Sequence, residues 1–131
     1  MIFVDSNVPM YLEGAPGALK DETLALLEEW LGSKERLVTS AEVLQEILHR
    51  YSSIGRRDAI QATFETLLGI VEEVFGIELR DIERAKAILM SSKALSARDS
   101  LHLAVMERHG VTRIASFDRG FDGYPGITRL S

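Results

Sequence analysis

Four acidic residues have types and positions that suit metal-dependent chemistry. They are Asp5, Glu46, Asp99 and Asp118. Carboxylates about 4 Å apart repel by about 1 kcal/mol in water and by up to about 4 kcal/mol at an effective dielectric of about 20, so a cluster of them must take up protons or bind a cation. Oxygen ligands in a chain without cysteine favour Mg²⁺ or Mn²⁺ over zinc. An acidic cleft of this kind suits phosphodiester hydrolysis by metal-activated water.

Alternating strand-like and helix-like segments predict how these acids are brought together. Strands are expected at residues 2–4, 37–39, 70–75, 112–117 and, as a short edge, 127–130; helices are expected at 19–31, 41–53, 60–68, 79–90 and 97–109. This alternation favours an α/β fold in three layers, with a central, mainly parallel sheet between helices. Asp5 and Asp118 end two of the strands, while Glu46 and Asp99 lie in the first two turns of helices. Because strand ends and helix starts share one edge of a parallel sheet, we expect all four acids there.

The composition of the chain is that of a globular domain. Its 131 residues are 46% hydrophobic and 27% charged, and no linker or repeat divides them, which predicts a single domain over residues 1–131. The absence of cysteine excludes a disulfide scaffold and a cysteine nucleophile. No apolar run approaches the roughly 18 residues of a membrane span, and the first residues lack the pattern of a signal peptide. We therefore expect a soluble, cytoplasmic protein with no membrane partner.

The net charge of −5 argues at first sight against a polyanionic partner such as RNA. However, residues 65–83 contain six acids and a single arginine, which accounts for the whole excess. The remainder of the chain is therefore neutral overall. The net charge does not exclude a nucleic acid substrate.

Each acid also has a purely structural interpretation. Asp5 and Asp118 could accept hydrogen bonds from the turns that follow them, and Glu46 could be a solvated helix charge. Asp99 could reach back to cap its helix at residue 96. Glu42 fits a capping box that begins at residue 39, so we interpret it as structural. The functional hypothesis depends on the four acids acting together.

In order and spacing, these residues resemble the PIN-domain family, and within it the VapC-like toxins of toxin–antitoxin systems. The resemblance extends over nearly the whole chain and is carried by Val4-Asp5-Ser6-Asn7, by residues 40–46, which end in Glu46, by residues 97–102 around Asp99, and by residues 114–122 around Asp118. Ser6 and Ser116 stand where the family often has threonine, and both keep the hydroxyl. The resemblance implies a PIN-like α/β/α sandwich.

The family resemblance also implies an activity and partners. We expect a Mg²⁺- or Mn²⁺-dependent endoribonuclease that hydrolyses RNA, the toxin of a pair whose cognate antitoxin blocks the site. A homodimer is common in the family. Asp5 and Asp99 are the expected metal ligands, with Glu46 and Asp118 completing the site directly or through water.

Further residues are expected to support the four acids. Ser6, Asn7 and Ser116 would orient carboxylates or water from behind the site, and Asp122 leaves open which aspartate completes it. Arg98 and Arg119 each adjoin a site acid and are candidates for RNA phosphate contact. His102 lies three residues after Asp99 on the same helix flank, and we interpret it as a structural partner rather than a general base.

Two other functional classes remain open. The first is a PIN-like protein that has lost hydrolysis and acts only by binding a partner or RNA. The second is a metal-dependent phosphatase or phospho-acceptor, which also places aspartates after parallel strands. That class requires a paired acid after the first strand or a lysine after the last, and the chain instead has Asp5-Ser6-Asn7 and no suitable lysine.

Overall fold

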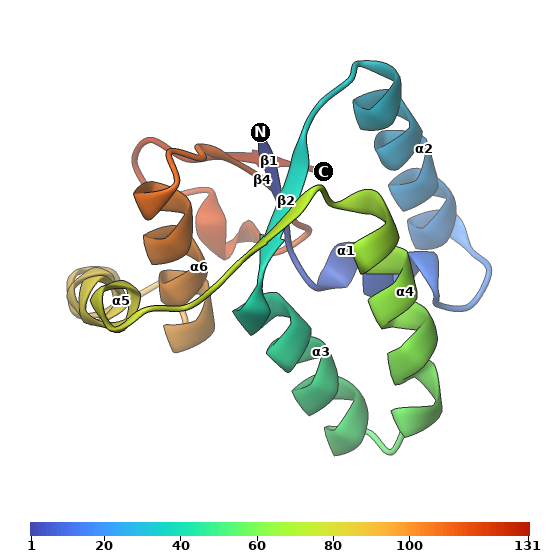
Figure 1. The fold of residues 1–131 in the computed structure, drawn as a ribbon, viewed down its shortest axis with the longest axis horizontal. Helices are drawn as coiled ribbons and strands as arrows, with labels where there is room; N and C mark the ends of the chain where they lie inside the picture. The colour runs from blue at the N-terminus through green and yellow to red at the C-terminus, as the bar shows by residue number, and fades with distance from the viewer.

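A five-stranded parallel sheet forms the centre of the protein (Figure 1). The computed structural model describes all 131 residues. The strands are β1 (Ile2–Val4), β2 (Leu37–Ser40), β3 (Glu73–Phe75), β4 (Arg113–Ala115) and β5 (Thr128–Leu130), in the order β3-β2-β1-β4-β5. All four strand pairs are parallel. The predicted α/β class is therefore confirmed.

Helices flank this sheet on both sides. They are α1 (Asn7–Leu12), α2 (Ala18–Gly32), α3 (Ala41–Ser53), α4 (Ile60–Ile70), α5 (Leu79–Ser91) and α6 (Ala97–Arg108), with single 3₁₀ turns at Arg57–Ala59 and Arg119–Phe121. Figure 1 shows α5 and α6 on one side of the sheet and α1, α2 and α4 on the other, while α3 leads away from the end of β2. None of the helices combines the length and the apolar character that crossing a bilayer requires.

Strand β1 and helix α6 form the centre of the core. All three residues of β1 are fully buried, because the strand pairs with β2 on one edge and β4 on the other and is covered on both faces. In α6, every residue from Asp99 to Met106 is buried, because α5 packs against it and α3 also contacts it. Polar side chains on α6 are therefore held in fixed surroundings.

The buried face of α5 differs from the prediction. The helical spacing of Ile82, Ala85 and Leu89 in the sequence predicts that these three residues point inward, but the buried residues are Asp81, Ala85 and Ile88. Ile82 and Leu89 are 49% and 38% exposed. The cause is an ion pair, since Nε of Arg108 on α6 lies 2.7 Å from Oδ1 of Asp81 and draws that acid into the interface.

Two local predictions were also wrong. The strand expected from residue 70 begins only at Glu73, because α4 continues through Gly69 to Ile70. The expected capping box at residues 39–42 does not form. Thr39 instead donates its hydroxyl to the backbone oxygen of Val4 at 2.9 Å, and α3 begins without a side-chain cap.

Candidate active site

The four acids line one cavity at the carboxyl edge of the sheet. Asp5 follows β1, Asp118 lies three residues beyond β4, Glu46 lies in the second turn of α3, and Asp99 lies in the first turn of α6. The cavity has a volume of about 650 Å³, within the range of small-ligand sites. Asp5 and Asp99 are buried, Glu46 is partly buried and Asp118 is exposed. The predicted convergence of the four acids is therefore observed.

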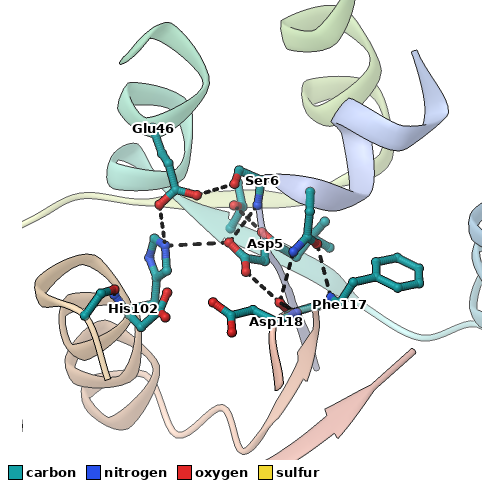
Figure 2. Close-up of polar contacts among 12 residues, drawn as sticks. Asp5, Ser6, Glu46, His102, Phe117 and Asp118 are labelled. Carbon is teal, nitrogen blue, oxygen red and sulfur yellow. Dashed lines mark hydrogen bonds and ion pairs between the residues drawn. The ribbon is translucent and has the colours of Figure 1, made fainter. Parts of the chain in front are cut away.

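Asp5 is fixed by hydrogen bonds to both carboxylate oxygens. The backbone N–H of Ser6 donates to Oδ1 at 2.8 Å, and the hydroxyl of Ser116 donates to Oδ2 at 2.7 Å. The Ser6 hydroxyl donates to Oε1 of Glu46 (Figure 2). One short segment after β1 thus orients carboxylates from two separate elements.

Asn7 joins the segment after β1 to the segment after β4. Its Nδ2 donates to the hydroxyl of Ser116 at 3.3 Å, and its Oδ1 accepts from the backbone N–H of Phe117 at 3.3 Å. The backbone N–H of Asp118 also donates to Ser116 Oγ, at 3.0 Å. These contacts hold the two strand ends in register behind the acids.

Asp99 and Asp118 combine local structural contacts with a place in the cavity. Ser96 Oγ accepts the backbone N–H of Asp99 at 3.1 Å, so only the serine half of the expected cap forms and the Asp99 carboxyl does not cap the helix. Asp118 Oδ1 accepts the N–H of Gly120 at 2.8 Å, which is the expected turn. These contacts are therefore compatible with a role for both acids in the site.

Burial and neighbouring carboxylates disfavour the ionised form of two of the acids. Burial raises the pKa of Asp5, although the charge of His102 opposes the change. Burial, followed by contact with Asp118, raises the pKa of Asp99 to about 7. For Glu46, burial also acts to raise the pKa, but contacts with His102 and Ser6 outweigh it and hold the pKa below its ordinary value. Such a site favours protons or a cation.

His102 belongs to this site, which the sequence interpretation missed. Its side chain is fully buried, and its Nε2 lies 3.4 Å from Oε2 of Glu46 and 3.7 Å from Oδ1 of Asp5 (Figure 2). Burial acts to lower the pKa of His102, but contact with these two carboxylates raises it overall. The spacing of three residues from Asp99 on one helix was a signal that could have indicated this position.

The predicted cationic and accessory residues divide into two groups. Arg98 lines the cavity, as does Arg50, which was not expected from the sequence. Arg119 does not line it. Asp122 also lies outside the lining and instead forms an ion pair with Arg129, whose Nε is 2.6 Å from Asp122 Oδ1. Of these two aspartates, only Asp118 therefore lines the cavity.

Comparison with known proteins identifies the family. The PIN domain family matches residues 2–127. The chain belongs to the PIN domain family. Ribonuclease VapC13 of Mycobacterium tuberculosis H37Rv is 57% identical over 131 residues, the whole of both chains, and Ribonuclease VapC23 of the same organism is 42% identical over 118 residues, covering 90% of this chain and 93% of that one. These identities place the PIN protein among the VapC ribonuclease toxins, as predicted.

Solved structures show the same fold. The crystal structure of M. tuberculosis VapC20, described as a Sarcin-Ricin loop cleaving toxin, matches with a TM-score of 0.75 at 23% identity and covers 97% of this PIN chain and 98% of that one. A toxin–antitoxin complex from Klebsiella pneumoniae matches with a TM-score of 0.72 at 20% identity, covering 100% and 97%. At these identities, the matches support the PIN-like architecture.

Proposed function

We propose that this chain is a metal-dependent endoribonuclease that acts as the toxin of a toxin–antitoxin pair. The observation that carries the proposal is the meeting of Asp5, Glu46, Asp99 and Asp118 at one cavity. The identity to VapC ribonucleases over the whole chain supplies the substrate class, RNA. A protein that only binds RNA or a partner would not require four converging carboxylates.

The residues of the cavity fit a divalent cation. Burial and the contact with Asp118 raise the pKa of Asp99 to about 7, and a bound cation would offset both effects. We assign Asp5 and Asp99 as the main ligands of Mg²⁺ or Mn²⁺, with Glu46 and Asp118 completing the site, because hard divalent ions prefer carboxylate oxygens. When bound, such an ion lowers the pKa of water and offsets negative charge on the phosphodiester.

Other side chains in and around the cavity orient the acids and bind RNA. Ser116 and Ser6 hold the Asp5 and Glu46 carboxylates in place, which preserves a ligand geometry. Arg98 and Arg50 line the same cavity and are suited to bind the phosphates on either side of the cleaved bond. We assign no phosphate contact to Arg119, which lies outside the cavity lining.

The proposed partners are a cognate antitoxin and a second copy of the chain. Solved complexes of similar fold, including the one from K. pneumoniae, contain a toxin with its antitoxin.

For the proposed dimer, Ile82 and Leu89 line an apolar hollow between α5 and α6, with Glu42 and Lys86 also in its lining. Two-fold symmetry would pair the acid of one copy with the lysine of the other. Light scattering should show a dimer that Ile82→Glu dissociates.

The test of the proposed activity is RNA cleavage by the intact protein. Structured RNA is incubated with wild type, Asp5→Asn and Asp58→Asn in Mn²⁺, in Mg²⁺ and in EDTA. We expect metal-dependent cleavage by wild type and by Asp58→Asn, whose carboxylate is exposed and paired with Arg56. Asp5→Asn should remain folded and lose at least about 100-fold in rate, more than an outer partner of a metal ligand usually contributes. Absence of cleavage by metal-loaded wild type would favour the binding-only alternative.

A further inference from the structure

His102 is a polar side chain of the site that is fully buried and makes no hydrogen bond. Its side chain has 0% exposure, and neither ring nitrogen forms a hydrogen bond, although Nε2 lies near the carboxylates of Glu46 and Asp5. Figure 2 shows the ring of His102 turned toward Glu46 and Asp5. We propose that Nε2 of His102 is itself a ligand of the divalent ion, so that the site contains a nitrogen donor and prefers Mn²⁺ and later transition ions to Mg²⁺. The inference rests on the metal site of the proposed function.

The spacing of the donors suits a shared ion. One ligand atom from each of Asp5, Glu46 and His102 can be chosen so that all three lie within 4.8 Å of one another. From Nε2, the distances are 3.4 Å to Glu46 Oε2 and 3.7 Å to Asp5 Oδ1. Two ligands that are each about 2.0–2.2 Å from one ion lie about 3 Å apart at a right angle and about 4 Å apart when opposite. The observed separations fall in this range.

The surroundings of the ring hold it in that position without engaging its nitrogens. His102 lies in the fully buried stretch of α6, and its ring packs against Phe3 of β1 with the centroids 5.5 Å apart. The neutral ring carries a lone pair on Nε2 when its proton is on Nδ1. Packing therefore points Nε2, with a lone pair available for a metal ion, toward the carboxylates.

The donor set has a consequence for ion selectivity. Mg²⁺ takes oxygen ligands almost exclusively, whereas imidazole nitrogen is a good ligand for transition ions, with affinity rising from Mn²⁺ through Co²⁺ to Ni²⁺. A site with only the four carboxylates would show a weaker bias of this kind. The alternative role of His102 is a counter-cation that donates a proton to Glu46 and never contacts the ion.

Pulsed EPR of bound Mn²⁺ separates these roles, because a coordinated imidazole nitrogen couples to the electron spin. The samples are wild type, His102→Gln and His49→Gln; His49 is an exposed histidine that does not line the acidic cavity. We expect ¹⁴N coupling in wild type and in His49→Gln, and its loss in His102→Gln. Titration should show Mn²⁺ affinity falling about tenfold or more in His102→Gln, and Mg²⁺ affinity falling less.

The outcomes distinguish this inference from the metal site itself. Mn²⁺ binding without ¹⁴N coupling in wild type, or coupling that persists in His102→Gln, would overturn the role of His102 and leave the proposed metal site intact. Failure of wild type to bind Mn²⁺ would overturn both. If His102→Gln does not fold, wild type labelled with ¹⁵N-histidine replaces it, and an unchanged coupling pattern would then reject histidine coordination.

Discussion

The hydroxyl of Ser116 donates a 2.7 Å hydrogen bond to Oδ2 of Asp5, a residue 111 positions away in the sequence. The contact forms because β1 and β4 are parallel neighbours, with Val4 paired to Ala115, so the residues that follow the two strands meet. Ser116 Oγ also accepts hydrogen bonds from Asn7 Nδ2 and from the backbone of Asp118. One donor and two acceptor sites are the full capacity of a hydroxyl. A single buried oxygen thus connects two site acids.

Replacing Ser116 with alanine should weaken the metal site more than the fold. Asp5 loses one of its two fixed partners, so we expect about a 10–100-fold loss of Mn²⁺ affinity and of RNA cleavage. The loss of the buried hydrogen bonds should cost about 1–3 kcal/mol of stability. Ser116→Thr keeps the hydroxyl and is the matched control. Titration calorimetry and urea unfolding measure the two effects, and equal metal affinity in both variants would contradict the argument.

The stability of the metal-free protein should fall as the pH rises toward 8. The Asp99 carboxyl has a pKa of about 7 in the folded chain, against an ordinary 3.8, so the folded state holds its proton more tightly. Its contribution to stability is present in full below about pH 4 and is lost as the pH rises through 7. Asp99→Asn should remove this dependence and be more stable than wild type at pH 8, by about 1–2 kcal/mol.

Addition of Mn²⁺ at pH 8 should reverse that order, because the ion stabilises wild type and finds a ligand missing in Asp99→Asn. Thermal unfolding between pH 5 and 8.5, with and without Mn²⁺, measures both effects. Parallel curves of stability against pH for the two proteins would show that the raised pKa of Asp99 is not the source of the pH dependence.

Arg98 and Arg119 should differ in their contribution to RNA binding. Arg98 lines the acidic cavity, and its charge helps to lower the pKa of Glu46, whereas Arg119 lies outside the cavity lining. Arg98→Ala, made in the inactive Asp5→Asn background, should lower RNA affinity and reduce the salt slope by about 0.7–0.9 for each phosphate that the side chain neutralises. Arg119→Ala should leave both unchanged. Measurements of RNA affinity at several salt concentrations test this prediction. Equal effects of the two variants would refute the assignment of a phosphate contact to Arg98 alone.

The buried pair between Arg108 and Asp81 should dominate the electrostatic contribution to stability. Two guanidinium nitrogens of Arg108 donate to the two carboxylate oxygens at 2.7 and 2.9 Å, and Asp81 is 1% exposed. Arg108→Ala leaves the buried carboxylate of Asp81 without its ion-pair partner and should lower the free energy of unfolding by about 3–5 kcal/mol. Arg84→Ala breaks an exposed pair with Glu107 and should cost less than about 1 kcal/mol. Urea unfolding measures the stability of both variants. Similar losses in Arg108→Ala and Arg84→Ala would contradict the prediction that the buried pair contributes more.

Local sequence patterns were sufficient to predict the sheet and the four acids. Short apolar runs that end in Asp5 and Asp118 indicate strands, and the parallel arrangement required by strand–helix alternation brings strand ends to one edge. Glu46 and Asp99 follow from the same rule, because their helices begin at that edge. These inferences depend only on the periodicity of apolar residues within each segment and on the parallel strand direction that the alternation of strands and helices implies.

Other features depended on contacts between distant elements. His102 is placed in the site by its proximity to Asp5 and Glu46. Periodicity could not indicate this, because α6 is buried from Asp99 to Met106 and has no polar face that marks a direction. Asp122 lies outside the cavity lining because Arg129 on β5 binds it, and Asp81 turns α5 inward because Arg108 pairs with it. In each case a partner far along the chain decides the orientation, and the residue types and spacing at the position itself do not specify that partner.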